Sequence, residues 1–317
     1  MRRSCSIPAL LALLVALPVV AQTPADECTS PGSGWIFCTG FEEGNLDLWD
    51  DYDGNPQPTN TILADPGPLD EPGNHVMRLY VPQDAQSADL VKLLPSRHAK
   101  LYARWYAYWE DGYDFGAANH GSGLHAGARE LMARSGYQPD GTDRYNAYVD
   151  HWPAEHRLVL YSYYRGMYQD CADPDGACWG DRFPCMFDEG QGYCTNPDHR
   201  ETTPTPVMQT GRWYCVEIMV DGGTPTDDPA RADGALDLWI DGVEYGPWTD
   251  LWMRTTADLE LSILWLNLFF HGAHADAGVR IDHVVVSTEP IGPVGTLTGI
   301  DDDGAPPSWS AVKKVFD

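Results

Sequence analysis

The chain has 317 residues and carries 20 basic against 47 acidic residues, a formal net charge of −27 at pH 7. So negative a global field excludes long-range attraction to nucleic acid or to an anionic membrane surface. The chain contains 31 glycines and 25 prolines, and long helical periodicity is absent. This composition favours one all-β domain with elaborate loops.

The N-terminus has the features of a cleaved secretory signal. Arg2 and Arg3 precede an apolar run over residues 7–20, and Val19-Val20-Ala21 supplies small residues for cleavage. The run is too short to span a bilayer comfortably, and no later segment approaches about 18 apolar residues. We therefore expect a signal peptide over residues 1–21 and a secreted or periplasmic protein.

The cysteine pattern fits an oxidising compartment. Cys28 and Cys38 can join a polar N-terminal arm, residues 22–34, to the first strand. The loop 168–206 is rich in Asp, Gly and Pro, and its simplest pairing is Cys171–Cys178 with Cys185–Cys194. A zinc site is the alternative, although the spacings of seven to nine residues are unlike those of zinc ligands. Cys215 is left over as a buried thiol on a strand.

Strands are predicted where β-branched and aromatic residues alternate with polar ones. The clearest runs are residues 35–38, 75–81, 101–109, 144–151, 158–167, 211–220, 234–242, 261–271 and 280–288. Asp241-Gly242 indicates a hairpin, because that turn needs positive φ at little cost. The glycine-rich segment 119–128 is expected to be irregular. The pattern predicts one β domain over residues 35–293, followed by an acidic tail over 294–317.

The predicted strand 261–271 separates an apolar face from a polar one. Leu264, Leu266, Leu268 and Phe270 share one face, which must be core. Trp265, Asn267, Phe269 and His271 alternate with them and point the other way. This places Asn267 and His271 on the open side of the sheet.

Four segments resemble jelly-roll polysaccharide lyases of the alginate and glucuronan type (families 14 and 20), within the concanavalin A-like sandwich class. They are residues 40–44, 121–127, the pair 211–213 and 237–242, and 281–288 closing on Ile291-Gly292-Pro293. The resemblance implies an all-β jelly-roll sandwich of two antiparallel sheets. It also implies a lyase that cleaves a uronic-acid polysaccharide by β-elimination.

The chain departs from that family's pattern at three points. No lysine lies between Lys100 and Lys313, although the glycine-rich segment of the family usually brings one. The strand that commonly presents an arginine near its end reads Tyr148-Val149-Asp150-His151 here. The cysteine-rich loop is additional.

β-Elimination requires a group that neutralises the carboxylate, a base for the C5 proton and an acid for the leaving oxygen. We expect Asn267 to neutralise the carboxylate and His271 to act as base or binder. Tyr163 is the preferred acid/base tyrosine. His125 lies in the glycine-rich segment, where backbone can approach a ligand, and is expected to be catalytic or carboxylate-binding. Each residue also has a structural alternative to its role in the reaction. Asn267 would be a hydrogen-bonded polar group in the sheet, Tyr163 a packed aromatic ring, and His125 a surface histidine.

The predicted substrate-binding residues are aromatic or cationic side chains on the same strand faces. Sugar rings stack on aromatic faces, and a cation beside aromatic rings suits an acidic sugar. Packing within the sheet explains these aromatic rows equally well. The predicted set is Arg104, Tyr106, Tyr148, Tyr161, Arg165 and Trp265.

A structural Ca²⁺ is the expected ion, since it requires hard oxygen ligands. Glu42 or Glu43 near Asp282 resembles the calcium site of sandwich carbohydrate modules, and Asp170, Asp173 and Asp175 form a weaker candidate. Solvated acidic loops are the alternative. His120, His271 and His274 are a minor candidate for another metal site.

Two further functions remain open. A noncatalytic carbohydrate-binding or matrix adhesion module would also use the 12 tryptophans and 16 tyrosines, and a bare aromatic platform would indicate it. A hydrolase would need two facing carboxylates, Asp150 with Glu217 or Glu110. The expected partner is a polysaccharide, an acidic glycan for the lyase, with no nucleic-acid or membrane partner, and we expect a monomer.

Overall fold

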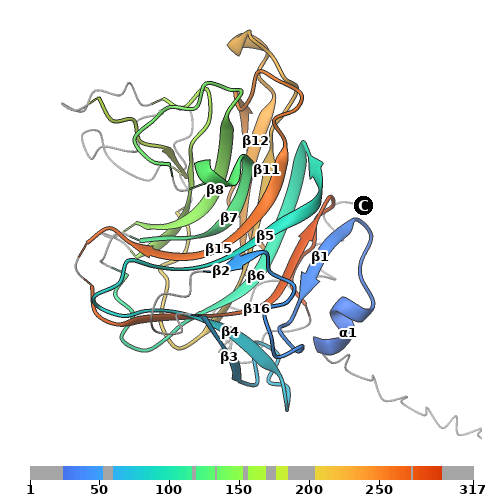
Figure 1. Ribbon diagram of the computed structural model, residues 1–317, viewed down its shortest axis with the longest axis vertical. Coiled ribbons are helices and arrows are strands. Elements are labelled where there is room, and N and C mark those ends of the chain that lie inside the picture. Colours follow the sequence, from blue (N-terminus) through green and yellow to red (C-terminus); the bar gives the residue numbers. More distant parts are fainter. Residues whose placement is uncertain are drawn as a thin grey trace, which may run out of the picture.

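The chain folds into two antiparallel sheets packed against each other, so the predicted all-β sandwich is confirmed. The computed structural model describes residues 24–52, 60–115, 119–132, 134–152, 156–168, 176–184, 204–272 and 274–294. Figure 1 shows the two layers, with β6, β16 and β4 in one and β8, β7, β15 and β5 in the other. Within these ranges no helix is long and apolar enough to cross a membrane.

The larger sheet has nine strands among the described residues. Its order is β13 (Val243–Glu244), β12 (Gly234–Ile240), β11 (Trp213–Asp221), β6 (Lys100–Trp109), β16 (Ala277–Ser287), β4 (His75–Val81) and β3 (Asn60–Ala64). Two more strands pair off this path, β1 (Trp35–Thr39) with β16 and β14 (Trp248–Leu251) with β12. We call it the nine-stranded sheet.

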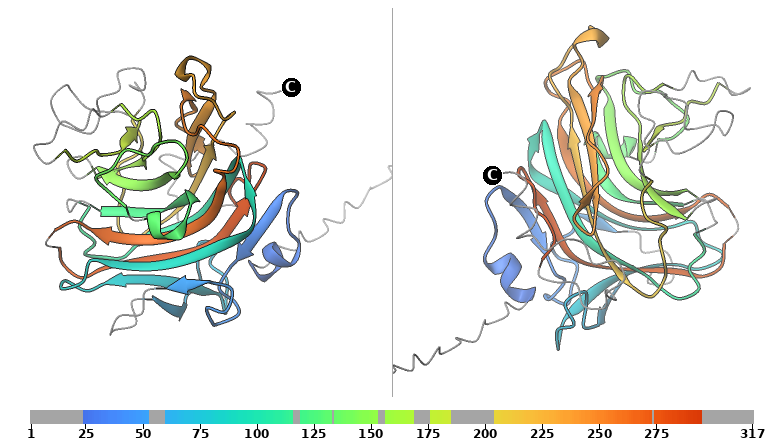
Figure 2. Two further views of the ribbon diagram at one scale, coloured as in Figure 1. Left: turned by 45° about the horizontal axis from the view of Figure 1, so that its top comes forward. Right: turned by 180° about the vertical axis from the view of Figure 1, so that it is seen from behind.

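The second sheet has seven strands over the same ranges. Its order is β10 (Asp181–Phe183), β9 (Arg157–Ser162), β8 (Arg144–Trp152), β7 (Asn119–Gly127), β15 (Leu261–Phe270), β5 (Ser87–His98) and β2 (Asp51–Tyr52). Figure 2 shows from two sides that the long strands of both sheets are strongly bent. Among the described residues, helical structure comprises α1 (Pro24–Thr29) and the 3₁₀ turns Arg129–Leu131 and Pro229–Arg231.

The core lies between the sheets, where the alternation in the sequence predicts it. The inward side chains of β6 are buried, and so are those of β15: Leu101, Ala103, Trp105, Ala107 and Trp109, with Leu264, Leu266, Leu268 and Phe270. The Asp241-Gly242 hairpin is also confirmed, with φ of 53° and 78°. The removal of apolar side-chain surface from water is the main driving force that brings these two faces together.

The glycine-rich segment is a strand, which corrects the expectation of an irregular loop. It forms β7, at the middle of the seven-stranded sheet, with partners on both edges. A Cβ on Gly123 would lie 2.2 Å from the backbone oxygen of Ala147 and 2.4 Å from the Cα of Tyr148. Low strand propensity is therefore outweighed by a close backbone approach that only glycine permits.

Two other boundaries differ from the prediction. The sequence pattern did not indicate the twelve-residue strand β5, whose alternation is interrupted by Pro95. Strand β9 ends at Ser162, so the predicted extension to residue 167 is wrong. The residues after Ser162 turn away and leave the ladder.

One disulfide joins Cys28 to Cys38, as the sequence predicts. Cys215 is a free and buried thiol on β11, also as predicted. Cys178 is disulfide-bonded. The predicted pairings Cys171–Cys178 and Cys185–Cys194, the aspartates at 170–175 and the acidic tail from residue 295 lie outside the described residues.

The N-terminal arm forms α1 and buries one carboxylate on the outer face of the nine-stranded sheet. Glu27 contacts the guanidinium of Arg104 on β6, and its Oε2 lies 2.6 Å from Nδ1 of His283 on β16. Arg104 and His283 are 0% and 1% exposed. Although burial alone would raise the pKa of Glu27, hydrogen bonding to His283 and the charge of Arg104 lower it.

We predict that Glu27→Gln lowers the free energy of unfolding by about 3 kcal/mol, because it leaves the buried guanidinium of Arg104 without its counter-charge. Urea denaturation under non-reducing conditions measures this loss. Glu289→Gln, at an exposed position, is the control and should change stability little. Equal stability of the two variants would contradict a structural role for the Glu27 cluster.

We also predict that Gly123→Ala destabilises the fold by about 2 kcal/mol, because β7 and β8 must separate to admit the methyl group. Thermal unfolding compares it with Gly272→Ala, where an added Cβ meets nothing within 4 Å. If Gly123→Ala is as stable as this control, the close approach of β7 and β8 is not required.

Candidate active site

A cavity of about 340 Å³ lies on the face of the seven-stranded sheet that points away from the core. Half of the twelve residues predicted for the site line it: Tyr148, Tyr161, Tyr163, Trp265, Asn267 and His271. They come from β8, β9 and β15 and from the segments that follow β9 and β15. Side chains that were not predicted complete the wall, including His120, Arg134 and Arg182.

A bulge in β7 brings His120 into this cavity. His120 pairs with Asp150 and Gly123 pairs with Tyr148, so β7 uses one more residue than β8 over the same interval. An extra residue reverses the alternation of side chains beyond it. His120, three residues from Gly123, therefore faces the same side as Tyr148.

Three aromatic side chains form a row across the cavity. Tyr148 pairs directly with Tyr161, and Gly123 lies between Tyr148 and Trp265. The ring centroid of Tyr148 lies 5.5 Å from that of Tyr161 and 6.1 Å from that of Trp265. Trp265 is fixed by a 2.7 Å hydrogen bond from its Nε1 to Asp89. The row offers apolar faces and polar rims to a sugar chain.

The tyrosines at the cavity wall are hydrogen-bonded to each other. Tyr161 donates its hydroxyl to that of Tyr163 at 3.2 Å and accepts the backbone N–H of Gly180 at 2.9 Å. Tyr163 is held from behind, where its backbone N–H donates to Asn146 Oδ1 at 3.0 Å. Burial raises the pKa of both hydroxyls, so they keep their protons at neutral pH.

Asn267 presents a side-chain amide that lacks any partner within the described ranges. The residue is 4% exposed, and neither its Oδ1 nor its Nδ2 makes a hydrogen bond. Its backbone N–H donates to Ser122 Oγ at 3.2 Å, where the pairing of β15 with β7 is irregular. Leaving both ends of a buried amide unsatisfied costs free energy. Such a group at a cavity wall is expected where a ligand supplies the missing partners.

Two histidines meet edge to edge in the cavity. Nε2 of His120 lies 2.5 Å from Nε2 of His271, and the rings are perpendicular at 88°. On the far side of His120, its Nδ1 lies 3.3 Å from Oδ1 of Asp150. Burial is the main cause that lowers the pKa of His271, and the neighbouring His120 lowers it further. That imidazole is therefore neutral at pH 7.

The cavity holds two guanidinium groups in different electrostatic states. Arg182 on β10 pairs with Asp150 at 2.8 Å. Although burial alone would raise the pKa of Asp150, Arg182 and His120 lower it to about 2. Arg134 stacks on Tyr137 at 4.4 Å and forms no ion pair with any described residue. The free positive charge of Arg134 favours an anionic ligand.

His125 is not in the cavity, although it lies on β7. It is 1% exposed, its Nε2 contacts the backbone oxygen of Ala128 at 3.3 Å, and burial lowers its pKa to about 4. A neutral, enclosed imidazole without access to the cavity suits packing. Its predicted catalytic role has no support in this geometry.

Three predicted binding residues also lie elsewhere. Arg104 and Tyr106 are on the outer face of the nine-stranded sheet, where Arg104 meets Glu27 and Tyr106 is buried beneath Val294. Arg165 follows β9 and stacks on Trp252 at 4.6 Å. The structure therefore does not bring these residues to the site. Alternation alone does not reveal which sheet β6 joins, and Arg165 lies beyond the end of β9.

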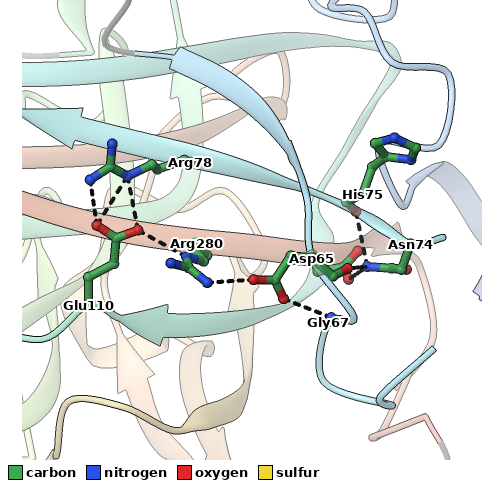
Figure 3. Close-up of polar contacts among 8 residues, drawn as sticks. Asp65, Gly67, Asn74, His75, Arg78, Glu110 and Arg280 are labelled. Carbon is green, nitrogen blue, oxygen red and sulfur yellow. Dashed lines mark hydrogen bonds and ion pairs between the residues drawn. The ribbon is translucent and has the colours of Figure 1, made fainter. Parts of the chain in front are cut away.

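Of the residues predicted to hold calcium, Asp282 lies on β16 of the nine-stranded sheet and Glu42 in the turn after β1, and neither lines the cavity. Oδ2 of Asp282 accepts Asn74 Nδ2 at 2.9 Å, and Glu42 accepts the backbone N–H of His75 at 3.0 Å. Figure 3 shows Asn74 and His75 beside the ion pairs that Arg78 and Arg280 form with Glu110 and Asp65. Burial raises the pKa of Asp282 to about 7, and Asn74 Oδ1 is buried without a partner among the residues shown by the structure. The oxygens of Glu42 and Asp282 are hydrogen-bonded, so of these three side chains only Asn74 Oδ1 is left, within the described ranges, as an oxygen without a partner for a hard cation. The described residues contain no group of three or more His, Cys, Asp or Glu side chains that could hold a metal ion.

The carboxylates proposed for a hydrolase do not face one another. Asp150 is on the seven-stranded sheet and is bound to Arg182. Glu217 lies on the nine-stranded sheet and accepts the backbone N–H groups of Ile291 and Gly292. Glu110 is engaged by two arginines. A glycosidase pair built from these residues is excluded by position.

Sequence reasoning overlooked Arg182 and Arg134 and used His120 only as a minor metal candidate. Arg182 is on a three-residue strand inside a segment expected to be a loop, which is too short for a periodic signal. Arg134 follows a 3₁₀ turn that has no cap signature. Only the serine and glycine of the bulge before Gly123 could have indicated that His120 changes face.

No protein-family model and no curated protein matches the sequence. Solved structures do match the fold. The PL-14 alginate lyase of Aplysia kurodai has a TM-score of 0.57 at 12% identity, covering 81% of this chain and 100% of that one. An alginate lyase from Chlorella virus gives 0.56 at 15% identity, covering 80% and 99%.

A third similar structure is the endo-β-1,4-glucuronan lyase of the fungus Trichoderma reesei. Its TM-score is 0.51 at 14% identity, and the match covers 80% of this chain and 96% of the lyase. Identities this low establish a shared architecture. The chain therefore has the jelly-roll sandwich fold of alginate and glucuronan lyases, as the four sequence segments predict.

Proposed function

We propose that the protein is a secreted polysaccharide lyase that cleaves a uronic-acid polysaccharide by β-elimination. The observation that carries the proposal is the convergence, on one cavity, of the unpartnered amide of Asn267, the histidine His271 and the tyrosine Tyr163. The fold shared with alginate and glucuronan lyases agrees with it. The predicted signal peptide and the Cys28–Cys38 disulfide support export.

In the proposed reaction, the amide of Asn267 and the guanidinium of Arg134 hold the uronate carboxylate and make the C5 proton acidic. His271 takes this proton, and the electron pair of the broken C–H bond forms the C4–C5 double bond. The C4–oxygen bond breaks, and Tyr163 donates its proton to the leaving oxygen. The products are an unsaturated uronate and a free hydroxyl.

Burial assigns the acid and the base. It raises the pKa of Tyr163, which therefore carries a proton to give, and it lowers the pKa of His271, which therefore has a lone pair to accept one. Groups whose pKa values are pushed in opposite directions are suited to these two roles. No lysine is needed for either step.

A noncatalytic carbohydrate-binding module is the second candidate, and the row of Tyr148, Tyr161 and Trp265 favours it. That row alone would bind sugar. It does not account for the buried amide of Asn267 or for the contact between His120 and His271.

We predict that the purified mature chain produces ultraviolet-absorbing unsaturated uronate from alginate, glucuronan or another polyuronate. Tyr163→Phe should lower kcat at least about 100-fold, because the leaving oxygen loses its proton donor. Tyr108→Phe, on the outer face of the other sheet, is the matched control and should retain full activity. Binding to a polyuronate without any rise in absorbance would instead establish the module.

We further propose that Ca²⁺ binds between Glu42 and Asp282 and stabilises the fold. Two carboxylates and the free Oδ1 of Asn74 would supply hard oxygen ligands. The ion would also replace the proton that burial favours on Asp282. It lies on the other sheet and takes no part in the elimination.

The pKa of Asp282 gives the proposed ion a pH signature. In the ion-free chain the raised pKa of about 7 favours the protonated carboxyl, so its contribution to stability is lost as pH rises from about 4 to about 7. Ca²⁺ should therefore raise the melting temperature more at pH 8 than at pH 5. Asp282→Asn should abolish the shift, whereas Glu289→Gln should keep it. A calcium shift that is unchanged in Asp282→Asn places the ion elsewhere.

A further inference from the structure

We propose that Asp150 and His120 are positioning residues that hold His271 in the tautomer whose Nδ1 lone pair is free to act in the cavity. The proposal rests on the proposed function, in which His271 is the base. It extends that function by naming the atom of His271 that accepts the proton and the residues that select it.

Asp150 selects the ring nitrogen of His120 that carries the hydrogen. Oδ2 of Asp150 accepts Arg182 Nε at 2.9 Å, and Oδ1 faces His120 Nδ1 at 3.3 Å. Asp150 is 1% exposed and sits beside a guanidinium, so its carboxylate is ionised and can only accept. This 3.3 Å contact is an ion-pair approach without hydrogen-bond geometry, since Nδ1 of His120 is buried with no hydrogen-bond partner among the described residues. The acceptor-only carboxylate still favours the tautomer with the hydrogen on Nδ1, which leaves Nε2 as the lone pair.

The tautomer of His120 determines that of His271. The two Nε2 atoms are 2.5 Å apart, which leaves room for one hydrogen between them. Since Nε2 of His120 is the acceptor, Nε2 of His271 must be the donor. A neutral imidazole carries one ring hydrogen, so Nδ1 of His271 is left unprotonated and ready to take a proton.

The ring of His120 is fixed in the orientation that this arrangement of Asp150, His120 and His271 needs. It is stacked between Tyr161, at 5.2 Å and 12°, and Phe269, at 5.9 Å and 14°. Rotation of the ring would break both stacks. The bulge in β7 places His120 in this slot, opposite Asp150 in register.

The proposed transfer of the C5 proton to His271 is balanced in protons and charge. When Nδ1 of His271 takes the C5 proton, the ring becomes an imidazolium whose Nε2–H still donates to His120. The new positive charge lies one ring away from the carboxylate of Asp150, which stabilises it without accepting a proton, as in an Asp–His pair. Arg182 on β10 opposes this charge, and the neutral hydroxyls of Tyr148 and Tyr161 on β8 and β9 face the same pair.

The tautomers can be read without any substrate. In the full mature chain labelled with ¹⁵N-histidine, long-range ¹⁵N–¹H NMR spectra at neutral pH should show His120 protonated at Nδ1. They should show His271 protonated at Nε2, with signals assigned from His120→Phe and His271→Gln. The opposite tautomer on either ring of the wild-type chain overturns the proposal.

Kinetics test the consequence for the reaction. His120→Phe keeps a flat ring in the slot but offers no acceptor, and should lower kcat about 100-fold with KM nearly unchanged. His120→Gln restores an acceptor oxygen and should recover part of that loss, whereas the distant control His98→Gln should match the wild type. The acidic limb of the pH profile should move in His120→Phe, because His271 loses its neighbour.

The outcomes separate the two proposals. A wild-type chain that eliminates no polyuronate overturns the proposed function, and the NMR tautomers then confirm or overturn the assigned tautomers of His120 and His271 independently. An active wild type with His120→Phe within about threefold of its kcat overturns the positioning role of His120 alone.

Discussion

Strand β7 runs between β8 and β15 at a point where its backbone has no side chain to interpose. At Gly123 the neighbouring backbone comes within 2.2 Å of the place that a Cβ would occupy. This close approach brings Tyr148 and Trp265 together on one face. The bulge beside it turns His120 to the same face. The cavity, its aromatic row and its histidine pair all depend on this single stretch of close backbone packing.

Burial has different consequences on the two sheets. In the cavity it separates proton donors from proton acceptors, since tyrosine hydroxyls keep their protons and His271 stays neutral. On the outer face of the nine-stranded sheet it encloses whole ion pairs, such as Glu27 with Arg104. On the nine-stranded sheet the enclosed ion pair holds the N-terminal arm to the domain. In the cavity, burial sets which groups keep a proton and which offer a lone pair.

The strongly acidic composition conceals this local arrangement. Most arginines in the described ranges are paired with a carboxylate, as Arg78 and Arg280 are with Glu110. Arg134 is a cavity-lining exception, because it stacks on Tyr137 and has no partner carboxylate among the described residues. An acidic protein can thus present a cationic point to a polyanion without a cationic surface.

Periodicity in the sequence was enough to predict particular strands and their faces. The apolar side of β15 and the alternation in β6 are local patterns, and they are buried as predicted. From the same pattern Asn267, His271 and Trp265 were placed on the open face, and all three line the cavity. Arg104 and Tyr106 failed as site residues, since their alternation was correct but their strand belongs to the other sheet.

The sequence by itself determined the fold class, the core faces and the residues that β15 offers to the cavity, because side-chain alternation is a property of each strand alone. Tertiary structure decided the rest: which strands share a sheet, where β7 gains a residue, and how Arg182 reaches Asp150. These depend on register between segments far apart in the chain. A shift of one residue turns every following side chain to the opposite face, and no local pattern records it.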